Sequence, residues 1–265
     1  MTIFCSLFSG SSGNAAVLRT DRGAVLIDCG MSGRQVLQAM GSVGLDPAEL
    51  CALLVTHEHS DHVRGVGVLS RKLGLPVYAT EGTWQGMESC LGDLPGERRI
   101  VITPGESFFL NELEIAPFAI PHDANEPVGY RIYLPGRSVA VATDLGYFSQ
   151  TVRDAVMGAD LVLLESNHDP DMLRQNPHYP SSLKRRILGK TGHLSNDSGA
   201  DAAVELARGG TRHLLLGHLS QENNTPDMAF RTTCGALEGQ GATVGEDVTL
   251  HVAGRSSASY LYTIA

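Results

Sequence analysis

In the first part of the chain, the pattern of hydrophobic and polar residues changes several times between the alternation typical of strands and the spacing typical of helices. This predicts strands separated by a few helices. Apolar or alternating runs bounded by turn residues predict strands at 3–8, 15–19, 24–29, 51–55 and 76–79. Apolar positions at helical spacing predict helices at 33–43, 63–73 and 81–91. This part is therefore expected to be β-rich with one βα unit.

The second part of the chain begins a new β-rich stretch. Strands are predicted at 99–103, 107–110, 112–120, 128–134 and 137–142. Helices at 150–157, 181–189, 197–208 and 227–239 then mix with strands at 160–165, 212–217, 247–252 and 259–264. Two mixed sheets packed face to face would satisfy this order, but periodicity does not choose that layering over another α/β arrangement. Because neither a low-complexity linker nor a short repeat divides the chain, a single domain spanning 1–265 is expected.

The densest polar motif follows the predicted strand 51–55 directly and reads Thr-His-Glu-His-Ser-Asp-His, residues 56–62. In an extended path His57 and His59 point the same way, because side chains two apart share a face. Asp61 and His62, at the next turn, then face a second position. Imidazole and carboxylate suit Zn, Mn or Fe. Three histidines this close together are too dense for an incidental polar loop, so the motif predicts metal binding.

Three later ligand-type residues each follow an apolar run, namely His122, Asp144 and His218. The end of a strand places a polar residue at the edge of a sheet, where loops gather into a site. Taken singly, each of the three could equally be a capped turn or a surface histidine. Asp28, at the end of the strand 24–29, is a candidate hydrogen-bond partner for a ligand histidine.

Composition limits the partners and the compartment. With 20 Lys and Arg against 29 Asp and Glu, the net charge is −9, which argues against a broad basic face for duplex nucleic acid. It does not exclude a phosphodiester substrate held at metal ions. The five cysteines are scattered, without a C-x-x-C pair, which indicates reduced thiols. No apolar stretch of membrane-spanning length and no secretory signal is evident, so a cytoplasmic protein without membrane contact is expected.

The run from His57 to His62 resembles the H-x-H-x-D-H signature of the metallo-β-lactamase superfamily, and the later His, Asp and His match its further motifs in order. The resemblance implies an α/β fold, the αββα sandwich of two mixed β-sheets flanked by helices. It also implies two divalent ions, Zn or Mn with Fe as a further option, which share a hydroxide. One ion would be held by His57, His59 and His122, the other by Asp61, His62 and His218, with Asp144 as the bridge.

Details around the ligands resemble the ribonuclease Z-like phosphodiesterase branch, because His193 supplies that branch's extra histidine. A zinc β-lactamase would show cysteine at Asp144, and a flavodiiron protein glutamate at His59. The stretches that resemble the YycJ/WalJ-like group of small bacterial metallohydrolases are 7–14, 122–124 with 127–130, 143–146, 164–169, 192–196 and 216–220 with 223–224. The group implies a nuclease, specifically a 5′-to-3′ DNA exonuclease, with DNA favoured over RNA as partner. The oligomeric state is not indicated.

The remaining roles follow from position. Asp61 and His193 are predicted to be catalytic, since an imidazole that titrates near neutrality can protonate a leaving oxygen. His193 could instead be a residue of a helix-capping loop. Predicted substrate contacts are Ser9, Ser11, Ser12, Asn14, Ser195 and Asn196. The loop Ser9–Asn14 could cradle an anion or be a flexible turn.

Three further residues or segments were weighed in the same way. Glu165 and His168 are expected to brace the site loop. The basic cluster Lys184–Lys190 is expected to be a solvated helix face, with a phosphate contact as the alternative.

Two other functions stay open. A small-molecule metallohydrolase for a cyclic phosphodiester, lactone or thioester would use the same metals with an apolar pocket. A non-catalytic metal-binding or redox protein would need no general acid.

Overall fold

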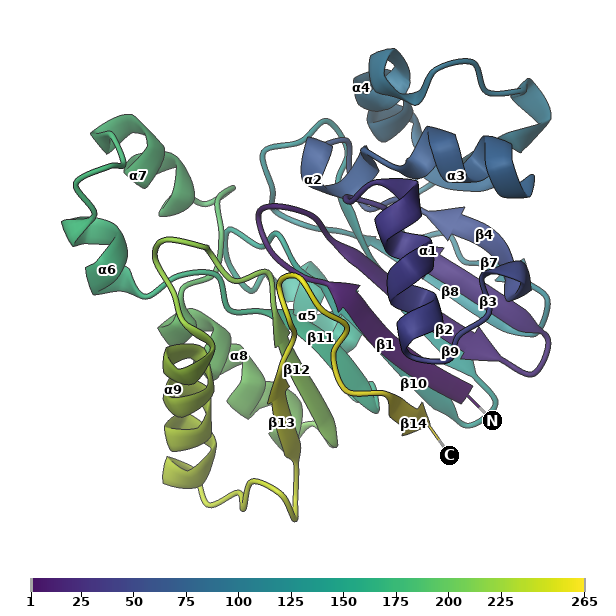
Figure 1. The fold of residues 1–265 in the computed structure, drawn as a ribbon. Helices are drawn as coiled ribbons and strands as arrows, with labels where there is room; N and C mark the ends of the chain where they lie inside the picture. The colour runs from purple at the N-terminus through teal and green to yellow at the C-terminus, as the bar shows by residue number, and fades with distance from the viewer. Residues whose placement is uncertain (1, 265) are drawn as a thin grey trace. The chain divides into compact units, whose positions relative to one another are not determined.

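The computed structural model describes residues 2–264 (Figure 1). Contacts between residues divide the chain into two compact units. Unit 1 contains the residues up to 106, 124–128 and those from 253 onward, and unit 2 contains 107–123 and 129–252. The single domain 1–265 stays a prediction. Among the described residues, no helix combines the length and the apolar character needed to cross a membrane.

Unit 1 contains a mixed seven-stranded sheet with the order β14-β1-β2-β3-β4-β5-β6. Its strands are β1 (Thr2–Phe8), β2 (Ala15–Thr20), β3 (Gly23–Ile27), β4 (Leu50–Leu54), β5 (Val77–Thr80), β6 (Arg99–Ile102) and β14 (Tyr262–Ile264). From β14 to β3 neighbouring strands are antiparallel, and from β3 to β6 they are parallel. The parallel strands β3 and β4 therefore end at the same edge.

The helices of unit 1 bury one face each. They are α1 (Gly33–Ser42), α2 (Ser60–Val63), α3 (Val66–Leu73) and α4 (Glu81–Leu91), with 3-10 turns at Pro47–Glu49 and Gly96–Arg98. In α1 the buried Val36 and Met40 are one turn apart, and Ser32 with Gln35 forms a capping box that begins the helix. The core combines these residues with strand residues such as Leu26 and Leu53.

Unit 2 contains a second mixed seven-stranded sheet with the order β13-β12-β11-β10-β9-β8-β7. Its strands are β7 (Phe108–Leu110), β8 (Leu113–Ala119), β9 (Val128–Leu134), β10 (Arg137–Ala142), β11 (Leu161–Glu165), β12 (His213–Gly217) and β13 (Thr249–Val252). The strands β10 to β13 are parallel, and their buried faces read as nearly continuous apolar runs.

The helices of unit 2 are α5 (Gln150–Val156), α6 (Pro170–Gln175), α7 (Ser181–Ile187), α8 (Asn196–Arg208) and α9 (Pro226–Gly239). The two longest, α8 and α9, pack side by side (Figure 1). They share a core with β11 and β12, to which Ala203 and Leu206 of α8 contribute. The helices α6 and α7 are short and follow β11 directly along the chain.

Three differences between the predicted and the observed elements have a physical reason. The helix 63–73 is divided into α2 and α3, because Gly65 donates to the Cys29 carbonyl at 2.7 Å and the chain bends to make this contact. The six-residue α6 was not predicted, since a helix this short shows no period. The last strand begins at Tyr262 instead of 259, because Ser259 bonds the backbone of Ser6 outside the ladder.

Candidate metal centre

A first cluster of histidines lies where β3 and β4 end, in unit 1. The carboxylate of Asp28 is 3% exposed and accepts hydrogen bonds from the backbone N–H and the hydroxyl of Thr56, both at 2.8 Å. It also lies 2.8 Å from His62 Nδ1. This contact orients the ring, so that Nε2 is the nitrogen of His62 that could bind a metal ion. The predicted contact between Asp28 and a ligand-type histidine is confirmed.

His57 and His59 converge within the same cluster. His57 Nε2 lies 3.1 Å from His59 Nδ1, and the opposite nitrogen of His57 lies 3.1 Å from the Thr56 hydroxyl. Two nitrogens bound to one tetrahedral zinc ion at about 2.0–2.1 Å lie about 3.3 Å apart. The pair therefore fits a shared cation. The side chain of Asp61 forms a second pair, with Oδ2 3.6 Å from His62 Nε2.

The loop Ser9–Asn14 contacts this cluster through Asn14. The Asn14 amide nitrogen lies 3.3 Å from Asp61 Oδ2 and 3.1 Å from His62 Nε2, while its oxygen accepts from the Gly10 N–H. Ser9 and Asn14 are buried, whereas Ser11 and Ser12 are exposed. Asn14 is thus placed to orient ligand-type residues, and Ser11 and Ser12 are the exposed serines of the loop.

Gly30, which directly follows the predicted strand 24–29, positions this cluster. A Cβ at this position would lie 1.6 Å from the Asp61 carbonyl oxygen. The Gly30 N–H donates to the Asn14 carbonyl, and the Asn14 N–H donates to the Asp61 carbonyl, both at 2.8 Å. A side chain at position 30 would separate these two loops.

Exchanging Asp28 for asparagine is expected to weaken zinc binding about 10- to 100-fold, because the amide no longer supplies a charged acceptor for His62 Nδ1. The measurement is a zinc titration against a chromophoric chelator, with circular dichroism to verify folding. Asp46→Asn serves as the matched control, since Asp46 caps an exposed 3-10 turn and asparagine caps equally well. Equal zinc affinity of the Asp28 variant and the control would contradict the assigned role.

A second cluster lies in unit 2 around the fully buried Glu165. Its Oε1 lies 2.8 Å from His193 Nδ1 and 3.0 Å from His218 Nδ1. Its Oε2 accepts from the backbone N–H groups of Leu145 and Leu194 at 2.7 and 3.0 Å. Burial opposes its ionisation, but the charge and hydrogen bonds of His193 together with those of His218 hold the pKa of Glu165 well below its usual range. One carboxylate therefore orients both imidazoles.

Asp144 lies between two predicted ligands in this cluster. Its Oδ1 is 3.4 Å from His218 Nε2 and 3.7 Å from His122 Nε2. The other nitrogen of His122 lies 3.2 Å from the Gly192 carbonyl, and burial lowers the pKa of His122, which favours the neutral, metal-binding imidazole. Asp144 and His218 both have positive φ, at 61° and 57°. The surrounding contacts hold both in this sparsely populated region, which is typical of functional sites.

His193 differs from its neighbours in exposure. Its side chain is 20% exposed, against 3% for Asp144, and its Nδ1 bonds Glu165. The cap of α8 is Ser195, whose hydroxyl accepts from the Ser198 N–H at 3.1 Å. His193 therefore does not cap the helix. Asp144, Glu165, His193 and His218 each offer one ligand atom, and these atoms all lie within 4.8 Å of one another.

The other residues near His193 support the scaffold. Asn196 is 1% exposed, and its amide bonds Ser166 and Asn224 at 2.7 and 3.0 Å. Ser195 caps α8, so both residues support the scaffold, and their contact with substrate stays a prediction. His168 is 1% exposed and forms a β-bridge to Ser195, and burial lowers its pKa to about 4. His168 and Glu165 brace the site loops, as predicted.

Mixed sheets whose strand ends carry imidazole and carboxylate clusters define a metal-binding α/β protein. Residues 24–219 match the family model of the β-lactamase superfamily domain. The exodeoxyribonuclease YycJ of Bacillus anthracis is 39% identical over 94% of each chain. The exodeoxyribonuclease WalJ of Streptococcus pneumoniae D39 is 39% identical over 92% of this chain and 91% of its own. This chain belongs to the β-lactamase superfamily and, within it, to the group of YycJ and WalJ.

A solved structure carries the same fold. The metallo-β-lactamase fold protein YhfI from Bacillus subtilis aligns with a TM-score of 0.73 over 99% of this chain and 100% of its own, at 16% identity. The predicted fold class of two mixed sheets flanked by helices is confirmed. Fold and donor set together indicate divalent-metal binding.

Proposed function

We propose that this chain is a metal-dependent phosphodiesterase that removes nucleotides from DNA ends, in the 5′-to-3′ direction. The observation that carries the proposal is the Glu165 carboxylate, which holds the ligand-type His218 and the more exposed His193 through their Nδ1 atoms. A metal ligand and a proton donor are thereby oriented by one buried group. The names of the two relatives at 39% identity support DNA as the substrate.

The metal centre is proposed to contain two divalent ions, Zn or Mn, with Fe as a further option. The superfamily signature supports the ligand set His57, His59, Asp61, His62, His122, Asp144 and His218. The nearly equal distances of Asp144 Oδ1 from one ligand-type imidazole of each ion support its role as the bridge. Such ions, when bound, supply a Lewis acid and an activated water molecule.

The protein's own groups then handle the protons. His193, whose Nδ1 bonds Glu165, presents Nε2 as the donor to the leaving oxygen, and the buried carboxylate stabilises the imidazolium that gives up this proton. Asp61, with a side chain that is 21% exposed, accepts a hydrogen bond from the attacking water and orients it. Ser11 and Ser12 are the exposed groups of the first loop that can contact a phosphate. The free cysteines support the cytoplasmic location.

A substrate panel tests this proposal. One preparation is assayed with Zn and with Mn against bis-p-nitrophenyl phosphate, single-stranded DNA and RNA labelled at either end, a lactone and a thioester. We expect phosphodiester turnover and release of mononucleotides from the 5′ end of DNA, with none after chelation.

Rapid thioester or lactone cleavage without phosphodiester turnover would replace the proposal by a small-molecule hydrolase. Metal binding without turnover of any substrate would replace it by a non-catalytic role. Equal digestion of RNA and DNA would overturn the DNA preference alone.

A further inference from the structure

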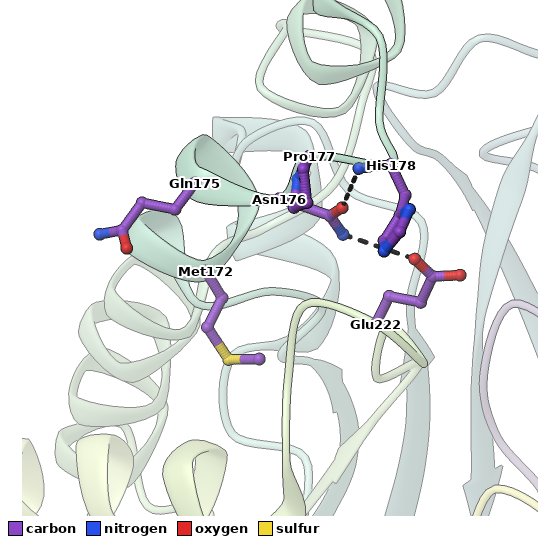
Figure 2. Close-up of a pocket in the computed structure, with 6 residues that line it drawn as sticks. All are labelled: Met172, Gln175, Asn176, Pro177, His178 and Glu222. Atoms are coloured by element: carbon purple, nitrogen blue, oxygen red, sulfur yellow. Dashed lines mark hydrogen bonds between the residues drawn. The ribbon is translucent and has the colours of Figure 1, made fainter.

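A pocket of about 710 Å³ lies in unit 2, apart from the metal ligands. Its lining comes from the end of α6, the following loop and the turn after β12, namely Met172, Gln175, Asn176, Pro177, His178 and Glu222. Figure 2 shows that Met172, His178 and Glu222 surround the pocket while Gln175 points away from them. The pocket is shallow and open to solvent.

The floor of the pocket contains Asn176, which is buried and hydrogen-bonded through both atoms of its amide. Its amide oxygen accepts from the His178 N–H at 2.8 Å, and its amide nitrogen donates to Asn223 Oδ1 at 2.7 Å (Figure 2 draws the first bond). Prolines at 177 and 180 restrict the same loop. Asn176 and the prolines therefore restrict the loop that carries His178.

A series of hydrogen bonds joins this floor to the metal-site cluster. Asn223 donates to the Ser220 hydroxyl, and the Ser220 N–H donates to the Asn167 carbonyl at 2.7 Å. The Asn167 amide donates to the His218 carbonyl at 2.8 Å. These hydrogen bonds thus connect the pocket to a predicted metal ligand, His218.

Positive charge is concentrated on the same arm, defined as residues 170–190 with α6 and α7. The arm contains Arg174, Lys184, Arg185, Arg186 and Lys190 against the single acid Asp171, in a chain with net charge −9. Arg185 and Lys190 are exposed. The arm leads directly to the second cluster, since the His193 N–H donates to the Ile187 carbonyl at 2.9 Å. A cationic surface beside a phosphodiesterase centre suits a polyanionic strand.

The side chains that line the pocket indicate which part of a nucleic-acid strand it can bind. The carboxylate of Glu222 repels a phosphate, whereas it can accept a hydrogen bond from the amino group of a base. The Met172 thioether, the Pro177 ring and the His178 imidazole offer flat or polarisable surfaces for stacking. Resting on the proposed function, we propose that this pocket holds one nucleobase of a single-stranded DNA end, while α7 contacts the phosphate backbone.

Binding of an uncleavable strand tests the pocket without any turnover. The probe is a short fluorescent phosphorothioate oligodeoxyadenylate, titrated with the zinc-loaded protein and followed by anisotropy. His178→Ala is expected to weaken binding about 5- to 150-fold, the effect of losing one stacking partner. Met172→Ala is expected to weaken it about 2- to 12-fold, the effect of losing one contact between sulfur and a ring. His251→Ala is the matched control, because His251 is an exposed histidine of the same unit.

Two further measurements separate base from backbone. The wild-type protein is expected to bind an oligonucleotide with one abasic position more weakly, and His178→Ala should no longer distinguish the two strands. Arg185→Ala is expected to reduce the slope of log affinity against log salt by about 0.7, the value for one phosphate contact on a single strand. The exposed Arg212→Ala should leave the slope unchanged.

Wild-type affinity in both pocket variants, or equal binding of abasic and intact strands by the wild type, would overturn the inference while leaving the exonuclease proposal in place. Conversely, the wild-type protein could degrade no DNA while the pocket variants bind the probe more weakly than it does. This result would support the pocket as a nucleobase site and overturn the proposed exonuclease activity.

Discussion

Replacing His193 by alanine is expected to lower kcat on DNA ends about 10²–10⁴-fold, the usual contribution of a general acid, while the protein keeps its fold and its metal ions. The Nδ1 of His193 bonds the buried Glu165, so its other nitrogen is the one available to donate a proton. An alkoxide leaving group needs that proton. A p-nitrophenolate leaves without it, so the loss on bis-p-nitrophenyl phosphate should be much smaller.

The comparison requires both substrates and a metal analysis on the same preparations. His251→Ala, in an exposed position on β13, is the matched control and should retain wild-type rates on each substrate. An equal loss of kcat on both substrates together with loss of metal would place His193 among the metal ligands. This is the main alternative, because His193 lies close to Asp144 and His218. Unchanged rates on both would leave it without a chemical role.

Replacing Asp144 by alanine is expected to remove at least one of two metal ions and to reduce phosphodiester turnover to the level of the chelated protein. Asp144 is 2% exposed and its Oδ1 faces the Nε2 atoms of His122 and His218. Its loss removes the anionic group between two ligand imidazoles, which reduces the affinity for a second cation most strongly. His59→Ala should also lose metal, because only one nitrogen of the pair with His57 then remains.

Elemental analysis of purified protein, before and after zinc or manganese loading, measures the outcome. Asp201→Ala, on the exposed surface of α8, is the control and should keep wild-type metal content and rate. Full metal occupancy in both the Asp144 and the His59 variants would reject the ligand assignment and the hydrolytic reading that depends on it.

The sequence identified the ligand types because their signals are local. His57 and His59 are two residues apart at the end of an apolar strand, so the spacing alone predicts that they converge, and the structure places their nitrogens 3.1 Å apart. The positions of the strands could also be predicted from the sequence, because a buried parallel strand such as β11 or β12 is a short continuous apolar run. The resemblance of several motifs to one superfamily then supplied the layering that periodicity left open.

Local signals do not reveal a hydrogen-bond partner that lies far along the chain. The amide of Asn196 bonds Ser166 and Asn224, which no spacing rule connects to it. The amide of Asn14 lies against Asp61 and His62, while the contact of Asn14 and Asn196 with substrate stays a prediction. In both cases the rotamer is set by packing against distant segments, and neighbours in sequence carry no information about it.

The amino-acid sequence was therefore sufficient for the strands, most helices and the set of metal-type side chains, because period, turn residues and short motifs encode them over a few neighbouring positions. The tertiary structure was needed to show which side chains Glu165 contacts, because its carboxylate bonds His193 and His218, which are 28 and 53 residues away along the chain. It was needed equally for the pocket formed by α6 and Glu222. The orientation of an imidazole depends on the hydrogen-bond acceptor that lies next to its Nδ1 in the folded chain. The packing of the parallel strands determines which residue provides this acceptor, and the local sequence does not.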